Sequence, residues 1–336
     1  MKADGSPAYP DVDLSPLISH PGVAIDYVAF GSEVSAAALK GYDALILLGS
    51  YFKVASIPED KRLAIVARFG VGYDTVEVGA CTTAGIALTI TPAGVRRPVA
   101  VAILTLLLAL AGRLMDKDRL TREGAEGFER RHAHMGVGLI GRTLASIGIG
   151  NVGAEMFRIA KPLNMRFIAH DPYADRAIAA ELGVELVDLM TVFKEGDFVT
   201  VNCPLSPATV HLVNAERLVL MKPTAFLINT ARGPIVDQAA LVETLQARRI
   251  AGAGLDVQEW EPPDLKDPLL RLDNVILAPH ALCWTDQCFA GIGASTVRSV
   301  LDVLNSRVPE GLVNKTVLDS PLWQERTARG YHLSDR

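Results

Sequence analysis

Three polar segments, each directly after a short apolar run, carry the side chains in this sequence that are best suited to chemistry. They are INTARGPIVD (228–237), GLDVQEWEPP (254–263) and LAPHALCWTD (277–286). Arg232 offers a planar guanidinium that binds a carboxylate through two parallel hydrogen bonds, and His280 offers an imidazole that takes up and returns a proton near neutral pH. Glu261 can hold that imidazole in one tautomer and stabilise its charged form. Because ligands bind at the carboxyl ends of parallel strands, we expect these three residues to form one site.

A glycine-rich turn supplies a second candidate site. Gly148, Gly150 and Gly153 form the pattern GxGxxG between the apolar run LASI and the amphipathic run AEMFRIAKPL. In that context Gly148 permits a tight turn, Gly150 lets the backbone approach a pyrophosphate, and Gly153 lets helix and strand pack closely. Asp171 ends the next strand-like run, where its carboxylate can bind the ribose hydroxyls and repel a 2′-phosphate; Arg176 is a weaker candidate to bind such a phosphate. The two sites together predict hydride transfer between NAD, rather than NADP, and a small 2-hydroxy acid.

Short apolar runs alternate with helix-like stretches along most of the chain, which is typical of parallel sheets with helices on both faces. The strand-like runs lie at 24–30, 43–49, 63–70 and 86–90, and then at 144–150, 165–171, 197–203, 224–230, 251–257 and 274–280. A long helix over about 97–119 and a polar surface connection over Asp116–Met135 separate the two series, and a second long helix is expected over about 285–305. We therefore predict an α/β protein of two doubly wound parallel-sheet lobes joined by two helices. Residues 1–105 with 286–336 form the substrate lobe, and residues 106–285 form the Rossmann NAD-binding lobe.

Composition narrows the class of partner. The chain has 336 residues, and its 33 basic and 38 acidic side chains give a net charge of −5, which argues against nucleic acid or an anionic membrane as a partner. The apolar run Val99–Ala111 is shorter than the roughly 20 residues that span a bilayer, so it predicts a buried helix. No apolar segment follows Lys2 as it would in a signal peptide. The four cysteines show neither a CxxC pair nor the density of a disulfide framework, so we expect a cytoplasmic protein.

In their order along the chain, these motifs resemble those of the D-isomer-specific 2-hydroxyacid dehydrogenases, the family of phosphoglycerate dehydrogenase and glyoxylate/hydroxypyruvate reductase. The resemblance covers about residues 40–315 and rests on FGVGYDTVEVGACTTAGIALTITP, GIGNVG, NCPLSPATVHLVN, INTARGPIVD, GLDVQEWEP, APH and GLVN. It implies Arg232, Glu261 and His280 as the catalytic residues, a flavodoxin-like substrate domain, and a substrate carboxylate held by the backbone of Val71 and Gly72. It also implies cofactor contacts at Asp171 and at residues that the glycine motif alone does not identify: Asn151, Val152, Cys203, Pro204, Thr209, Thr230 and, for the carboxamide, Asp256.

The sequence departs from the family pattern where the substrate pocket is expected. Leu282-Cys283 replaces the usual Gly-Gly after the catalytic histidine, bulky Trp284 follows, and the helix that usually begins with Val-Ala-Glu lacks its acid. Arg68 precedes the carboxylate-binding loop, and Arg96 and Arg97 stand at the start of the long helix. These cations favour a substrate with a second anionic or strongly polar end, such as a phosphorylated or polyhydroxylated three- to four-carbon acid. Arginines that flank a buried helix and face water would fit the same pattern.

Other functions fit single features of the sequence less well. His280, Cys283 and Cys288 lack the paired spacing of a zinc site, so we expect no metal. Nothing in the sequence indicates that Cys283 is an activated nucleophile. The alternative function is a non-catalytic NAD-sensing scaffold, like the transcriptional corepressors built on such folds, but the Arg, Glu and His together argue for an enzyme. By analogy with the family we expect a homodimer that buries the helix at 97–119.

Overall fold

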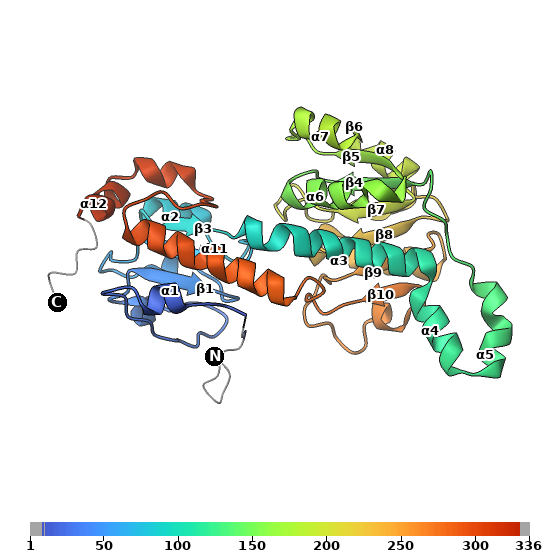
Figure 1. Cartoon of the computed structure of the whole chain (residues 1–336), viewed down its shortest axis with the longest axis horizontal. Coiled ribbons are helices and arrows are strands. Elements are labelled where there is room, and N and C mark those ends of the chain that lie inside the picture. The colour runs from blue at the N-terminus through green and yellow to red at the C-terminus, as the bar shows by residue number, and fades with distance from the viewer. Residues whose placement is uncertain (1–8, 10, 330–336) are drawn as a thin grey trace. The chain divides into compact units, whose positions relative to one another are not determined.

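The computed structural model describes Tyr9 and residues 11–329 and divides the chain into two compact units. The central unit is Arg96–Cys283, and the terminal unit combines Met1–Val95 with Trp284–Arg336. Figure 1 follows the chain through both units. The boundary expected after residue 105 falls instead at 95/96, because most of the long helix packs against the central sheet. The N-terminal stretch expected to lack a signal peptide lies largely outside the described residues, as do residues 330–336.

The central unit contains a seven-stranded, fully parallel sheet with the order β10-β9-β8-β7-β4-β5-β6. Its strands are β4 (Thr143–Ile147), β5 (Arg166–His170), β6 (Val184–Leu186), β7 (Phe198–Val201), β8 (Phe226–Asn229), β9 (Gly252–Leu255) and β10 (Val275–Leu277). The strand order reverses direction between β4 and β7, and such a switch point is where open α/β sheets bind ligands. All of these strands were predicted except β6, a three-residue edge strand with one buried side chain.

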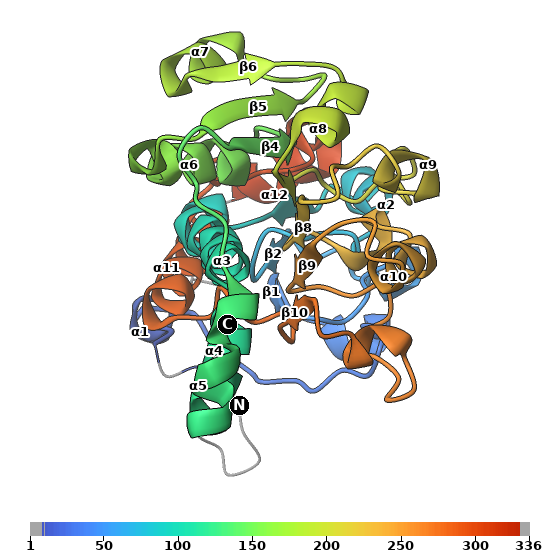
Figure 2. The same ribbon diagram turned by 90° about the vertical axis from the view of Figure 1, so that its right-hand side faces the viewer.

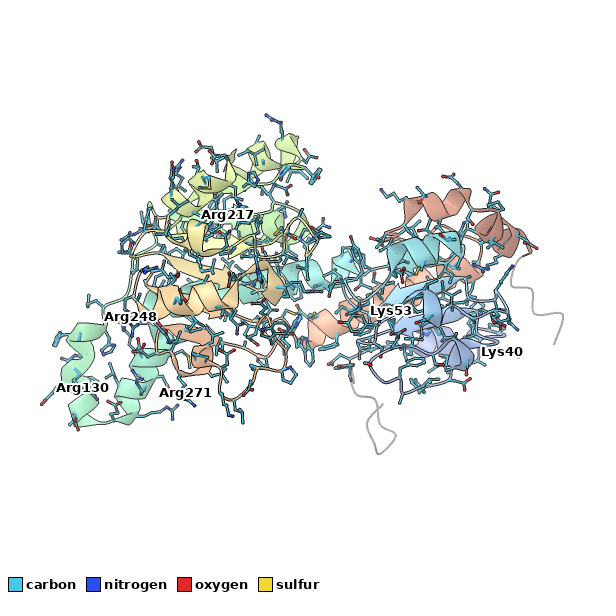
Figure 3. The ribbon with its side chains drawn as sticks, turned by 180° about the vertical axis from the view of Figure 1, so that it is seen from behind. Lys40, Lys53, Arg130, Arg217, Arg248 and Arg271 are labelled. Carbon is cyan, nitrogen blue, oxygen red and sulfur yellow. The ribbon has the colours of Figure 1, made fainter. Side chains whose placement is uncertain are left out.

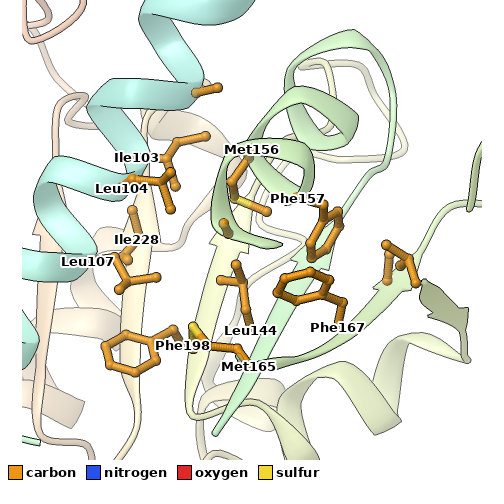
Figure 4. Close-up of a cluster of buried hydrophobic side chains, with 14 of the residues drawn as sticks. Ile103, Leu104, Leu107, Leu144, Met156, Phe157, Met165, Phe167, Phe198 and Ile228 are labelled. Atoms are coloured by element: carbon orange, nitrogen blue, oxygen red, sulfur yellow. The ribbon is translucent and has the colours of Figure 1, made fainter. Parts of the chain in front are cut away.

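Helices cover both faces of the central sheet, as predicted for a doubly wound fold (Figure 2). On one face lie α3 (Pro92–Gly112), α6 (Asn151–Ala160) and α7 (Arg176–Leu182); on the other lie α8 (Leu189–Glu195), α9 (Ala215–Leu218) and α10 (Gln238–Gln246). Figure 3 shows the second face, with Arg217 on α9 and Arg248 just beyond α10. Figure 4 shows the core of the first face, where Leu107 and Phe157 pack beside the strand residues Phe167 and Phe198. Strands buried on both faces explain why their sequences are apolar without alternation.

Two helices occupy the segment for which a polar surface connection was predicted. α4 (Leu114–Arg122) and α5 (Ala125–Arg130) extend from the body of the central unit, followed by the 3-10 turn η3 (Arg131–His134) (Figure 1). The expected single helix over 97–119 is wrong, because α3 ends at Gly112 and Arg113 adopts a left-handed φ of 52°. The helices left no apolar period in the sequence because ion pairs such as Arg122–Asp118 stabilise α4, and such pairs need no apolar stripe.

The terminal unit holds a three-stranded parallel sheet in the order β1-β2-β3 within the described residues. Its elements are α1 (Ser15–Ile18), η1 (Ala36–Leu39), β1 (Ala44–Leu47), η2 (Val54–Ser56), β2 (Ile65–Arg68), α2 (Val78–Thr83), β3 (Ala87–Thr89), α11 (Asp286–Leu304), η7 (Lys315–Asp319) and α12 (Pro321–Arg329). The strand predicted at 24–30 does not form, and Tyr27 and Val28 are 57% and 44% exposed because no neighbouring strand buries them. The apolar run was present, but it has no pairing partner among the described residues.

The helix α3 is the one helix among the described residues that is long and apolar enough, by length and composition, to cross a membrane. Half of its most apolar window is buried inside the protein. Ile103, Leu106 and Leu107 are fully buried in the core cluster on the first face of the central sheet. The same helix exposes Val101 and Leu108 to solvent.

Candidate active site

His280 and Glu261 are in direct contact at the carboxyl ends of the neighbouring strands β9 and β10. The His280 Nδ1 lies 2.8 Å from the Glu261 Oε2, and the other oxygen of Glu261 accepts a hydrogen bond of 3.0 Å from the Gln258 N–H. His280 adopts a left-handed φ of 54°, and its N–H donates to the Asp256 carbonyl at 2.7 Å. A carboxylate that contacts one ring nitrogen fixes the tautomer and leaves the Nε2 for proton exchange with a substrate.

The electrostatics of this pair keep Glu261 charged. Burial by itself would raise the pKa of Glu261, but the hydrogen bonds from His280 and from the Gln258 N–H, together with the charge of Arg232, lower it below its ordinary value. The carboxylate is therefore ionised throughout the neutral range, where it stabilises a positively charged imidazole.

Asp256 holds the backbone of the segment that contains His280. Its side chain is buried, and its carboxylate accepts hydrogen bonds from the N–H groups of Ala281 at 3.0 Å and Leu282 at 3.1 Å. Burial raises the pKa of Asp256, although these two N–H donors act in the opposite direction. Asp256 was singled out from the family resemblance as a contact to the cofactor carboxamide; in the structure it also holds the backbone of His280 and of the two residues that follow it.

Arg232 follows β8 in a loop whose backbone is held by the buried side chain of Asn229. Asn229 accepts a hydrogen bond of 3.0 Å from the Ala231 N–H and donates one of 2.9 Å to the Arg232 carbonyl. At the next residue, Gly233, a Cβ would lie 1.8 Å from the Gln258 carbonyl oxygen, so only glycine allows this approach. The loop of Arg232 therefore packs directly on the segment that presents Glu261.

The predicted glycine turn opens α6 with the three roles distributed as expected. Gly148 has a φ of 100°, and a Cβ there would lie 2.9 Å from the Asn202 backbone at the switch point. A Cβ on Gly153 would lie 2.6 Å from the Gly148 carbonyl oxygen, whereas nothing lies within 4 Å of a Cβ on Gly150. Asp171, just after β5, accepts hydrogen bonds from the N–H groups of Ile149 and Tyr173. Open space at Gly150 beside a helix N-terminus and an acid at the end of β5 fit a dinucleotide.

The remaining predicted cofactor residues stand around the same end of the sheet. Asn151 and Val152 begin α6, and Cys203, Pro204, Thr209 and Thr230 follow β7 and β8. The Thr230 hydroxyl is buried and has no hydrogen-bond partner in the described part of the chain, which leaves it available to a ligand. Burial raises the pKa of Cys203 to about 11, so this thiol stays protonated. No group of three or more His, Cys, Asp or Glu side chains among the described residues is placed to hold a metal ion.

The predicted substrate residues divide between the two units. Val71 and Gly72 follow β2 in the terminal unit, in a loop where the Gly70 N–H donates to the Thr91 hydroxyl at 3.1 Å. Arg68, the last residue of β2, directs its guanidinium to the Phe69 carbonyl oxygen.

Arg96 and Arg97 begin the central unit and meet an acid that the sequence did not reveal. Arg97 forms an ion pair of 2.8 Å with Glu155 of α6, and Arg96 lies 3.9 Å from the same carboxylate. Glu155 is buried, and a third arginine, Arg158, contacts it at 2.7 Å. The local charge at the start of α3 is therefore partly compensated, although the usual acid on α3 is missing.

Sequence reasoning missed the residues that hold the site together. Asn229, Gln258 and Gly233 contact the loops of Arg232 and Glu261 but have no reactive groups of their own. Asn229 could have been noticed as a polar residue that ends a buried apolar strand. The interaction between Gly233 and Gln258 has no sequence signal, because it depends on how two loops pack.

The fold and the site define an NAD-linked oxidoreductase, and comparisons with known proteins agree. Residues 104–281 match the family described as D-isomer specific 2-hydroxyacid dehydrogenase, NAD binding domain. The chain is 38% identical over 282 residues to a glyoxylate reductase from Korarchaeum cryptofilum, covering 83% of this chain and 85% of the relative. It is 36% identical over 254 residues to a D-3-phosphoglycerate dehydrogenase from Archaeoglobus fulgidus, covering 76% of this chain and 48% of that longer relative.

A solved structure shows the same fold. The TT0316 protein from Thermus thermophilus is 32% identical and superposes with a TM-score of 0.76, covering 83% of this chain and 88% of that one. The chain belongs to the D-isomer specific 2-hydroxyacid dehydrogenase family. It is an NAD-dependent enzyme of this family, and no comparison favours the non-catalytic alternative.

Asp171 provides a test of the cofactor preference. The substitution Asp171→Ala should narrow the preference for NADH over NADPH by about tenfold or more, because it removes both an acceptor for the ribose hydroxyls and a charge that repels the 2′-phosphate. The measurement is kcat/KM for each cofactor at saturating 2-oxo acid. An unchanged ratio in the variant, or equal use of both cofactors by the wild type, would refute the assignment.

Proposed function

We propose that the enzyme interconverts a small, polar 2-oxo acid and the corresponding D-2-hydroxy acid. The observation that carries the proposal is the 2.8 Å contact between His280 and Glu261, beside a loop that presents a guanidinium. When bound, the nicotinamide supplies the hydride acceptor or donor. Arg232 binds the substrate carboxylate, and His280 donates a proton to the carbonyl oxygen on reduction or takes it from the hydroxyl on oxidation. Glu261 stabilises the protonated imidazole.

The contacts of the basic residues favour an unphosphorylated substrate. Of the two polar classes that the sequence favours, a phosphorylated acid needs a cation to bind its second anionic group. Arg96 and Arg97 lie near the buried Glu155, and Arg68 donates to a backbone carbonyl, so all three candidate cations have partners inside the protein. A hydroxylated or unsubstituted short acid needs no such cation. The glyoxylate reductases among the relatives match this chain over most of their own length, which supports the same substrate class.

A panel of four substrates tests this proposal. With NADH, kcat/KM for glyoxylate and hydroxypyruvate should exceed that for 3-phosphohydroxypyruvate by about tenfold or more, a difference of about 1.4 kcal/mol in transition-state binding. Pyruvate, which carries a methyl group where glyoxylate has a hydrogen and hydroxypyruvate a hydroxymethyl group, should fall between these groups. Arg68→Ala is the matched variant and should change all four values by the same factor. A preference for the phosphorylated acid that disappears in Arg68→Ala would contradict the assignment.

The subunit arrangement that best fits the surface is a homodimer formed through the central unit. Exposed apolar side chains follow α3 and the helices beyond it: Val101, Leu108, Leu114, Met115, Phe128, Met135 and Ile140. Exposed apolar patches of this kind mark protein contacts. Burial of this surface in a cytoplasmic dimer accounts for the apolar outer face of α3 without a membrane, and the net charge of −5 offers no general attraction to nucleic acid.

A further inference from the structure

A second acid lies two residues before Glu261 and has a different set of contacts. The Glu259 carboxylate lies 2.7 Å from the His211 Nε2 and accepts a hydrogen bond of 3.1 Å from the Gln238 N–H at the start of α10. The Glu259 N–H in turn donates to the Gln238 side chain at 2.9 Å, and that side chain donates to Asp267 at 2.6 Å. Glu259 therefore joins three segments that are far apart in the sequence, and its side chain is only 15% exposed.

His211 is itself held firmly. It adopts a left-handed φ of 50°, and its N–H donates to the Pro234 carbonyl at 2.9 Å, in the turn that begins directly after Arg232. Arg217, labelled in Figure 3, donates to the Leu212 carbonyl at 2.7 Å and fixes the chain on the other side of His211. The backbone on both sides of the imidazole is thus held in place, and the half-exposed ring contacts Glu259.

The Glu259 segment is continuous with the catalytic pair. Gln258, its neighbour, donates its N–H to the Glu261 carboxylate at 3.0 Å and its side-chain amide to the Ala278 carbonyl at 3.3 Å, two residues before His280. On its other side, the Gln258 carbonyl packs against Gly233, where no Cβ would fit. Because the Gln258 backbone is packed closely against Gly233, it cannot move in that direction. A shift of Glu259 would therefore displace the neighbouring Glu261.

We propose that His211 is a positioning residue that acts through Glu259 to set the contact between Glu261 and His280. This inference rests on the proposed roles of Glu261 and His280. Without the imidazole, a mostly buried carboxylate loses a charged or polar partner, and such groups move toward water when they are left unpaired. That movement displaces Gln258 and lengthens the hydrogen bond between Glu261 and His280. The groups that face His280 are Glu261 and Asp256, with Arg232 beside Glu261, and none of these is changed chemically by a substitution at His211.

The test compares His211→Ala with His211→Gln, whose amide can still donate to Glu259. In His211→Ala, kcat for 2-oxo acid reduction should fall by about tenfold, the usual size of effect for an outer contact that orients a reacting group. The alkaline limb of the pH profile of kcat/KM should move to lower pH, because a longer contact with the Glu261 carboxylate stabilises a positive charge on His280 less well. His211→Gln should restore most of kcat and the position of the limb. His20→Ala, which removes a ring whose one hydrogen bond is to the adjacent Pro21 carbonyl, is the control and should leave both unchanged.

A double substitution shows whether the effect runs through Glu259. Because the two residues act as one unit, His211→Ala combined with Glu259→Ala should lose no more activity than either single variant. A purely additive loss, or a pH profile identical to the wild type in every soluble variant at His211 and Glu259, overturns the proposal even where thermal stability falls. If His280→Ala itself keeps wild-type turnover, the proposed function fails instead, so the two failures are distinguishable. If His211→Ala does not fold, the pH profiles of His211→Gln and Glu259→Gln decide the matter by the same criterion.

Discussion

His280→Ala should lower kcat/KM for 2-oxo acid reduction by about 10²- to 10⁴-fold, the range that positioned general acids contribute. The nucleotide contacts predicted for the glycine turn and Asp171 lie in separate segments, so the affinity for NADH should stay within about twofold of the wild type. Steady-state kinetics and a fluorescence titration with NADH measure the two quantities on the same preparation. Turnover near the wild-type rate with intact NADH binding would remove His280 from the mechanism.

The companion variant Glu261→Gln tests how much the carboxylate of Glu261 contributes to proton transfer by His280. The pKa of Glu261 is lowered, so its carboxylate is charged across the neutral range and favours the imidazolium form of His280. Reduction consumes the proton of that imidazolium, and its rate therefore falls as the pH rises. The neutral amide removes this negative charge, so the alkaline limb of the pH profile should move to lower pH while the loss at the pH optimum stays smaller than in His280→Ala.

The contact between Glu261 and His280 could be predicted from local features of the sequence. Glu261 and His280 each come a few residues after an apolar strand, and β9 and β10 are adjacent and parallel, so their carboxyl ends must be close. The glycine turn is specified in the same local way, because Gly148 and Gly153 adopt the close approaches that their positions require. The roles of these residues in catalysis stay predictions.

The features that sequence reasoning missed depend on long-range packing. Arg97 and Glu155 are 58 residues apart, and nothing in either local sequence indicates that they meet. The contact between Glu259 and His211 spans 48 residues and depends on the close packing of Gly233. The segment 24–30 has the apolar pattern of a strand, but a strand also needs a partner edge, which is a property of the whole unit. Long-range contacts of this kind determine which of several strand-like segments of the sequence actually form strands.

Arg232→Ala should raise KM for 2-oxo acids and lower kcat/KM by about 10²- to 10³-fold, because a charged, bidentate partner of the substrate carboxylate is lost. Arg232→Lys should recover only part of this loss, since an ammonium restores the charge but not the planar pair of donors. The Asn229 contacts to the loop use only the Ala231 and Arg232 backbone, so the loop itself should keep its conformation in both variants.

A neutral substrate analogue distinguishes carboxylate binding from a general disturbance of the site. The wild type should prefer a 2-oxo acid over its methyl ester, whereas Arg232→Ala should lose most of that preference because the guanidinium is what recognises the negative charge. Arg248→Ala is the matched control, since Arg248 is an exposed arginine of the same unit that pairs with Asp273. It should retain both the wild-type rate and the wild-type preference. If Arg232→Ala discriminates between acid and ester as strongly as the wild type does, the carboxylate is bound by other groups, and the Val71–Gly72 backbone becomes the first candidate for that role.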